Sequence, residues 1–392
     1  MKQSLLHTPD GVRDIYGREL LEKEYVASAI MNNIHSYGYR KIETPTIEFL
    51  DCFGNDIGTM PSNELFKLFD KEGNTLCLRP DFTPSIARCA SKYFMEEDMP
   101  LRFCYEGSTF VNSSELQLKL KENSQLGMEL INDGSVEADA EILFLVIEGL
   151  KAAGLNDFQI SVGETNYFKG ICEEAKLDEE TELALKDSIS SKNYFGTREF
   201  LKKQGFEDDF IRHFDAISKL FVSTTDLKQL AQEVTNDRSK LAIERLISIR
   251  EILKKKGYDK YVSFDLSMLS KYHYYTGIIF NAYTYKVGEA VAKGGRYDGL
   301  LEKFGKAAPS IGCVFFAGEI QNALRRQQIE IPNHQKESVL LLYQPSEFDH
   351  ALKTSEDLRS EGINVTMMKK EKPIEIYERY RSEHGYQRLI EL

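Results

Sequence analysis

The sequence lacks the patterns that mark disulfide-rich, metal-binding and membrane-spanning proteins. Its six cysteines form no C-x-x-C pair and have no histidine at a metal-ligand spacing, which predicts reduced thiols and no metal site. The first 11 residues hold one lysine and no apolar run, so we expect no secretory signal. The longest apolar run near a helix, residues 142–147, is far shorter than the ~20 residues that cross a bilayer. We therefore expect a cytoplasmic protein that does not contact a membrane.

Cations are scarce relative to acids. Lys and Arg number 50 against 62 Asp and Glu, a net charge of −12. Polyanion binding depends on a surplus of clustered cations, so a general affinity for nucleic acid is not favoured, although a local basic groove stays open. With 392 residues, 42% of them hydrophobic, the chain has the composition of an ordered globular protein of two or three domains.

The hydrophobic periodicity predicts an α+β core. Apolar residues at spacings of three and four predict helices at 19–34 and 136–153, and the second has an acidic first turn before a stop at Gly154. Strand patterns cover residues 75–78, 101–105, 158–162, 261–266, 278–285 and 311–316. Turns and long excursions separate these strands in place of regular crossover helices. That arrangement favours an antiparallel sheet flanked by helices over a doubly wound parallel fold.

Changes in composition and in hydrophobic period divide the chain into a core, a linker and a C-terminal piece. Within a core of residues 1–328, the stretch 166–256 is charged, rich in Leu, Lys and Glu, and helical in period, which predicts a helical insertion. Residues 329–338 are polar and contain a proline, which indicates a linker. Residues 339–392 alternate strand and helix patterns, so we expect a small β-α-β-α piece, short for an independent α/β domain.

Two stretches place polar residues beside or within apolar strands. In L-R-P-D-F-T, Asp81 and Thr83 supply a carboxylate and a hydroxyl that can bind an ammonium group, or that end an ion-paired strand. In Q-L-G-M-E, the period of two puts Gln125, Gly127 and Glu129 on one strand face. The glycine would let a small ligand approach closely, or the face is simply solvated.

A third stretch is rich in tyrosine. It contains Tyr272, His273, Tyr274 and Tyr275, and G-G-R-Y-D-G follows from Gly294. Rigid tyrosine walls with hydroxyl groups suit a small aromatic ligand. The paired glycines lack the spacing of a nucleotide-binding fingerprint and indicate a turn. His273 has no serine or cysteine partner in the sequence and is weak evidence for a catalyst.

Six motifs, taken in order, resemble the class II catalytic core of histidyl-tRNA synthetases over about residues 5–325. They are P-D-G-V-R-D from Pro9, G-Y-R-K-I-E-T-P-T-I-E from Gly38, L-R-P-D-F-T from Leu78, Q-L-G-M-E from Gln125, Y-Y-T-G from Tyr274 and G-G-R-Y-D-G-L from Gly294. The resemblance implies a class II antiparallel sheet, a dimer that pairs around residues 38–48, and a C-terminal piece similar to a shortened anticodon-binding domain.

The sequence departs from the synthetases where they bind ATP. By resemblance, arginines of the synthetases correspond to Val111, Ser270 and Glu319, and their Gly- and Arg-rich stretch corresponds to residues 118–123. Adenylate formation needs cationic clamps on the triphosphate, and loss of one preorganised group commonly costs ~10² to 10³ in rate. The resemblance therefore predicts that the chain has no catalytic residues and does not aminoacylate tRNA.

The amino-acid side of the synthetase pattern is kept. Asp81 stands where the family holds an acid for the amino group, and the other matching positions are Thr83, Gln125, Glu129, Tyr274 and Tyr275. An amino-acid pocket without activation chemistry resembles the family of ATP phosphoribosyltransferase regulatory subunits, which act in the first step of histidine biosynthesis. The family implies activation of a short-form catalytic subunit, feedback inhibition by L-histidine, a homodimer within a hetero-octamer, no cofactor and no tRNA.

Two alternatives stay open. A divergent synthetase-like enzyme could adenylate or aminoacylate an acceptor if Lys119, Lys121 or Arg326 replaced the missing arginines, and histidine-dependent pyrophosphate exchange would reveal it. A non-enzymatic sensor or scaffold with another partner also fits. A short catalytic subunit encoded nearby favours the regulatory subunit, and a full-length one with its own regulatory domain favours the sensor.

Overall fold

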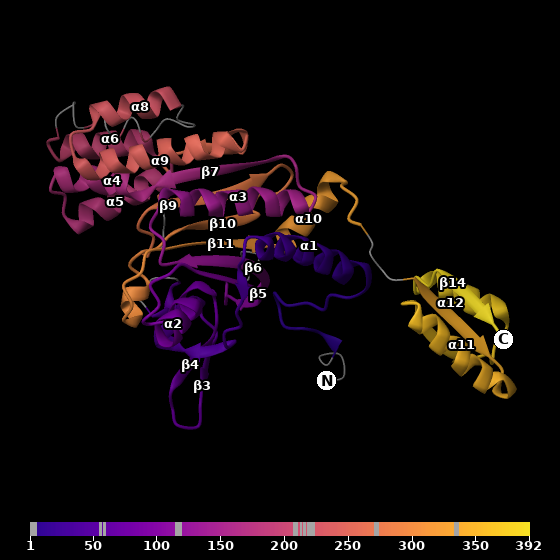
Figure 1. The fold of residues 1–392 in the computed structure, drawn as a ribbon. Coiled ribbons are helices and arrows are strands. Elements are labelled where there is room, and N and C mark those ends of the chain that lie inside the picture. Colours follow the sequence, from indigo (N-terminus) through magenta and orange to yellow (C-terminus); the bar gives the residue numbers. More distant parts are fainter. Residues whose placement is uncertain are drawn as a thin grey trace. The chain divides into compact units, whose positions relative to one another are not determined.

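A computed structural model describes residues 6–54, 57, 60–113, 120–206, 211, 214, 217, 224–269, 274–332 and 337–392 (Figure 1). The chain divides into two compact units, Met1–Ile331 and Pro332–Leu392. In the part of the chain that is described, no helix is long and apolar enough to cross a bilayer.

The first unit is built on an eight-stranded sheet of order β1-β5-β6-β11-β10-β9-β7-β8. Its strands are β1 (Arg40–Lys41), β5 (Leu101–Phe110), β6 (Glu122–Ile131), β7 (Phe158–Glu164), β8 (Val262–Phe264), β9 (Ile278–Thr284), β10 (Ala292–Arg296) and β11 (Ser310–Phe316). The α+β prediction is confirmed, and the six central strands pair antiparallel. The edge pairs β1–β5 and β7–β8 are parallel, which the prediction of an antiparallel sheet did not include. Each edge strand is joined to its neighbour by a long crossover, which parallel pairing requires.

Three helices pack together on one face of this sheet: α1 (Gly17–Ser36), α3 (Val136–Ala152) and α10 (Ala317–Gln327) (Figure 1). Helix α1 buries Val26, Ile30 and Ile34, which follow the four-residue spacing of one helix face. Helix α3 is capped by the Ser135 hydroxyl, which accepts a hydrogen bond from the Ala138 amide at 3.1 Å. These helices and the sheet residues that face them form the main hydrophobic core.

Helix α2 (Thr83–Tyr93) packs against the other face of the sheet. Strand β5 shows the alternation, because Cys104 belongs to the main core whereas Phe103 and Tyr105 belong to a second cluster with α2. A small antiparallel sheet of order β2-β4-β3 adjoins α2; its strands are β2 (Ile47–Phe49), β3 (Lys67–Phe69) and β4 (Thr75–Leu78). Short 3-10 helices are η2 (Leu50–Phe53), η3 (Ser62–Glu64), η5 (Asp259–Tyr261) and η6 (Leu301–Phe304).

The regular elements described between β7 and β8 are all helices. The α-helices among them are α4 (Thr165–Glu174), α5 (Glu179–Ser190), α6 (Tyr194–Lys203), α8 (Thr224–Glu233) and α9 (Asp237–Lys255). They group at one end of the sheet (Figure 1), and α9 packs against both α4 and α3. We refer to α4 through α9 as the helical insertion.

The second unit is a three-stranded parallel sheet of order β13-β12-β14. Its elements are β12 (Ser338–Tyr343), η7 (Pro345–Glu347), α11 (Phe348–Ser360), β13 (Asn364–Lys369), α12 (Ile374–Glu383) and β14 (Arg388–Glu391). Alternate residues of β12 belong to two different clusters, with Val339 and Leu341 in one and Leu340 and Leu342 in the other, so the sheet is apolar on both faces. The predicted β-α-β-α pattern has two strands, and the end of the chain supplies the third.

Candidate functional site

The three polar stretches meet at one cavity of about 1990 Å³ in the first unit. It lies on the side of the sheet that carries α2. All of the candidate site residues line it: Asp81, Thr83, Gln125, Glu129, Tyr274 and Tyr275. The structure therefore brings together residues that are almost 200 positions apart in the sequence (81 to 275).

Asp81 and Thr83 lie where β4 ends and α2 begins. The Oδ1 atom of Asp81 accepts hydrogen bonds from the amides of Phe82 at 2.7 Å and Thr83 at 3.4 Å. Burial raises the pKa of Asp81, and these backbone hydrogen bonds oppose the rise. Arg79 points elsewhere: its guanidinium donates to the carbonyls of Ser108 at 2.9 Å and Thr44 at 2.8 Å. The short run after β4 thus presents a carboxylate and a hydroxyl to the cavity.

Strand β6 forms part of the cavity floor. Its residues Gln125, Gly127 and Glu129 share one face, as the period of two predicts. The reason for the glycine differs from the expected one. A Cβ at Gly127 would lie 2.3 Å from the phenol of Tyr105, so the glycine makes room for a buried tyrosine and not for a ligand. Among the described residues, the buried Oε1 atom of Gln125 has no hydrogen-bond partner.

Glu129 is the most enclosed acid of the cavity, with 1% of its surface exposed. The Thr83 hydroxyl donates to its Oε1 at 2.7 Å, and the Tyr297 hydroxyl donates to its Oε2. Burial raises the pKa of Glu129 to about 8, although both hydrogen bonds oppose the rise. The carboxyl is therefore largely protonated near neutral pH and can exchange a proton with a basic ligand.

Tyrosines form one wall. The rings of Tyr274 and Tyr275 lie 4.6 Å apart, and the ring of Tyr297 stands edge-on to Tyr274 at 6.3 Å. We call these three residues the tyrosine wall. The paired glycines do not form the expected turn; they lie within β10, where a Cβ at Gly295 would meet the Tyr275 ring at 2.7 Å. The wall depends on glycine in the adjacent strand.

Sequence reasoning missed Tyr105 and Tyr297 as site residues. Both are almost completely buried, and burial raises the pKa of each phenol well above its ordinary value. A buried tyrosine hydroxyl usually has a polar partner, and Tyr297 has Glu129. The only signal in the sequence was the place of Tyr297 in the G-G-R-Y-D-G-L motif, and Tyr105 lies in no quoted motif.

Val111 and Glu319, two of the positions where synthetase arginines are absent, also line the cavity. They follow the ends of β5 and β11 that pair with the first half of β6, away from Glu129, and we call this part the opposite end of the cavity. Ser270 and His273, with residues 118 and 119, lie outside the described residues. Of the cations suggested as substitutes, Lys121 and Arg326 are not among the described residues that line the cavity, and Lys119 lies outside the described residues.

The arginines that do line this end are held by carboxylates. Arg13 donates to both carboxylate oxygens of Glu19, at 2.5 and 3.1 Å, and this hydrogen bond lowers the pKa of Glu19. Arg325 forms an ion pair with Glu22 at 2.6 Å and lies 3.8 Å from Glu19. Their charge is thus offset within the protein. Among the described residues, no cluster of His, Cys, Asp and Glu is arranged to hold a metal ion.

The chain is similar to known proteins over most of its length. The family model for histidyl-tRNA synthetase matches residues 11–318. The ATP phosphoribosyltransferase regulatory subunit of Acetivibrio thermocellus is 36% identical over 365 residues, which cover 93% of this chain and 87% of that protein. The regulatory subunit of Thermoanaerobacter pseudethanolicus is 32% identical over 388 residues, 99% of this chain and 100% of that protein.

A solved structure gives the same result. The crystal structure of an ATP phosphoribosyltransferase regulatory subunit/histidyl-tRNA synthetase from Bacillus halodurans is similar with a TM-score of 0.88 and 28% sequence identity. The match covers 99% of this chain and 98% of that chain, so both compact units have counterparts there.

Proposed function

Because the chain belongs to the histidyl-tRNA synthetase family and, within it, to the regulatory subunits of ATP phosphoribosyltransferase, we propose that it binds free L-histidine and regulates a catalytic partner. It does so without charging tRNA. The observation that carries the proposal is the enclosed amino-acid end of the cavity beside an end whose arginines are absent or held by carboxylates.

The amino-acid end is complementary to histidine. Asp81 and the Oε1 atom of Gln125 are acceptors for an α-ammonium group. Glu129 suits the imidazole in either charge state, since the protonated carboxyl donates to a ring nitrogen and the carboxylate accepts from an imidazolium. The tyrosine wall supplies flat surfaces for the ring.

The other end argues against adenylate formation. A triphosphate would meet Val111 and the carboxylate of Glu319 where the family pattern has arginines. Arg13 and Arg325 would have to leave their carboxylate partners before they could bind phosphate. A histidine-dependent pyrophosphate exchange assay should therefore give no activity, and measurable exchange would overturn this part of the proposal.

The regulatory role follows from linkage. Histidine inhibits if it binds more tightly to the less active state of the assembly. We propose a short-form catalytic subunit as partner and a homodimer of this chain within a hetero-octamer, in the cytoplasm. Ile47 and Phe49 of β2 are 50% and 59% exposed, close to the stretch through which class II cores pair, and this supports the dimer. We assign the second unit to a shortened anticodon-binding-like domain.

Calorimetry tests the proposal most directly. L-Histidine should bind the full chain, alone or with its partner, and Asp81→Ala and Glu129→Ala should each weaken binding and inhibition without unfolding the chain. Glu106→Gln, an exposed acid of β5 paired with Lys41, is the control and should have no effect. The proposal fails if the chain neither binds the short catalytic subunit nor raises its activity.

A further inference from the structure

We propose that the helical insertion is coupled to the tyrosine wall through two arginines of α9, Arg238 and Arg245, and thereby regulates the affinity of the pocket. The identity of the ligand rests on the proposed function, whereas the coupling rests on the contacts alone. Arg238 and Arg245 are seven residues apart, which places them two turns apart on one face of the helix. Each begins a separate route to the wall.

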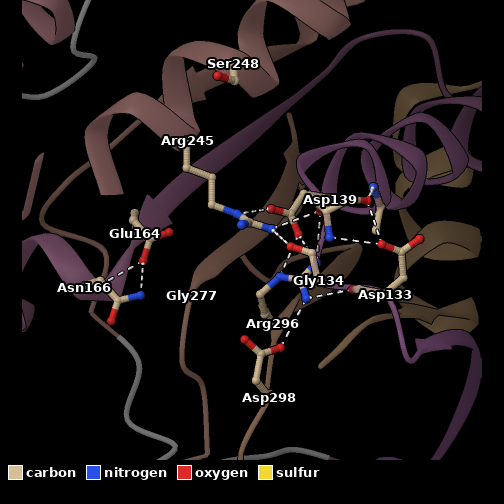
Figure 2. Close-up of polar contacts among 12 residues, drawn as sticks. Asp133, Gly134, Asp139, Glu164, Asn166, Arg245, Ser248, Gly277, Arg296 and Asp298 are labelled. Carbon is tan, nitrogen blue, oxygen red and sulfur yellow. Dashed lines mark hydrogen bonds and ion pairs between the residues drawn. The ribbon is translucent and has the colours of Figure 1, made fainter. Parts of the chain in front are cut away.

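The first route runs through Asp139 of α3, whose side chain is completely buried. Figure 2 shows this carboxylate between two arginines: Arg245 donates to Oδ2 at 2.5 Å, and Arg296 donates twice to Oδ1 at 2.9 and 2.6 Å. Burial raises the pKa of Asp139, and both arginines oppose the rise. Arg296 ends β10 and directly precedes Tyr297. One carboxylate therefore joins the insertion to the strand that carries one member of the wall.

Arg296 extends this route to the other two tyrosines. Its Nη1 atom donates to Asp298 at 3.1 Å, and the Asp298 amide donates to the Thr276 hydroxyl at 2.8 Å. The Thr276 amide donates in turn to the carbonyl of Arg296 at 2.8 Å. Thr276 directly follows Tyr275, so the segments that carry all three tyrosines are held to one another.

The second route runs through Asn166 of α4. The guanidinium of Arg238 donates twice to the Asn166 side-chain oxygen, at 2.9 and 2.8 Å. The Asn166 side-chain amide donates to the carbonyl of Thr276 at 2.6 Å, and it also contacts the buried Glu164 at 3.0 Å (Figure 2). Thr165 donates from its amide and its hydroxyl to the carbonyl of Gly277, at 3.2 and 3.1 Å.

These hydrogen bonds connect the helical insertion to the segments that carry the tyrosine wall. The segment that carries Tyr274 and Tyr275 precedes β9, and the bonds from Asn166, Thr165 and Arg296 hold its carboxyl end. A displacement of α9 moves both arginines together, so it moves the wall. Because coupling between two sites is reciprocal, a ligand that binds more tightly to the ordered wall also favours the position of α9 seen here, by the same coupling free energy.

The first test needs no ligand. We would measure hydrogen exchange by mass spectrometry on the full chain with Arg238→Gln and Arg245→Gln combined. Exchange at residues 274–278 and 296–298 should become at least ~10-fold faster, because Asn166 and Asp139, which position these segments, each lose an arginine partner and the segments open more often. Lys240→Gln is the matched control, since it removes one positive charge from an exposed position of the same helix. Unchanged exchange in the double variant overturns the coupling.

Two further variants separate positioning from folding. If the double variant does not fold, Arg238→Gln alone carries the test, because that side chain is 39% exposed. Arg245→Lys keeps a cation near Asp139 and should restore slow exchange in part. If the arginines had only a structural role, the substitutions would lower the melting temperature and speed hydrogen exchange throughout the core. The tyrosine wall would then exchange no faster than its surroundings.

The second test uses L-histidine. The double variant should bind it about 5- to 10-fold more weakly than the wild type, a typical range for coupled sites, while Lys240→Gln binds normally. Histidine should slow exchange in α9 of the wild type but not of the double variant. Wild-type affinity in the double variant overturns the coupling. If the wild type does not bind histidine, the proposed function fails, and the ligand-free exchange still decides the coupling.

Discussion

The two ends of the cavity differ in the partners of their ionisable side chains. At the amino-acid end, the acid Glu129 is bonded by the neutral hydroxyls of Thr83 and Tyr297, which leaves its proton exchangeable with a ligand. At the other end, the cations Arg13 and Arg325 are bonded by carboxylates of α1, so a phosphate would have to displace these carboxylates to reach either guanidinium. The acid at the first end has neutral partners, whereas both arginines at the other end are already paired with groups of opposite charge. The four predictions below test that comparison.

The largest effect concerns the pH dependence of stability. The pKa of Glu129 is about 8 in the folded chain against an ordinary value of 4.5, so between these pH values the folded state binds the additional proton. This contribution is complete below pH 4.5 and is lost as the pH rises through 8. Over that window, the free energy of unfolding of the wild type should fall relative to Glu129→Gln by at most about 5 kcal/mol. Chemical denaturation at several pH values measures it, and parallel curves for the two proteins would contradict a buried, protonated Glu129.

The second prediction compares glycines of the two ends. Gly127→Ala should destabilise the chain by about 2 to 4 kcal/mol, because its Cβ would overlap the Tyr105 phenol at 2.3 Å and the Cys313 carbonyl at 2.6 Å. Gly318→Ala, in the first turn of α10, is the control, since no atom lies within 4 Å of its Cβ. Thermal unfolding measures the stability of both variants. If Gly127→Ala melted at the same temperature as Gly318→Ala, strand β6 and Tyr105 could move enough to accept the methyl group.

The third prediction removes one neutral partner of Glu129. Tyr297→Phe should weaken histidine binding by about 5-fold, since its hydroxyl holds the neutral Glu129 carboxyl in place and a hydrogen bond between neutral groups is worth about 1 kcal/mol. Calorimetry measures the change. Tyr283→Phe, a partly exposed tyrosine of β9 that does not line the cavity, serves as the matched control. Unaltered affinity in the first variant would show that the hydroxyl only fills space.

The smallest effect is expected at the opposite end. Val111→Arg combined with Glu319→Arg should raise the affinity for tripolyphosphate by about 3- to 10-fold at low salt, as expected for two cations at partly exposed positions. Histidine affinity should stay the same, because both positions belong to the other end of the cavity. Titration with tripolyphosphate gives the first quantity and calorimetry the second. A loss of histidine affinity would show that the two ends are not independent.

Much of the fold could be predicted because its signals are local. The four-residue spacing in α1, the acidic start of α3 and the alternation in β6 each depend on residues within one element. The parallel edge strands β1 and β8 could not be predicted, because their direction depends on where long crossovers return the chain. The strand position of Gly294 and Gly295 could not be predicted either, because paired glycines are typical of a turn, whereas here they lie in the central strand β10.

The sequence by itself determined which residue types face the cavity: the strand period grouped Gln125 with Glu129, and the resemblance marked Val111 and Glu319 as replaced arginines. Only the tertiary structure decided their electrostatic state. Glu129 has a raised pKa because the folded chain buries it, although hydroxyls from two other segments oppose the rise, and Arg13 is held because α1 brings a carboxylate to it. Desolvation and pairing depend on distances between elements, and those distances exist only once the chain has folded.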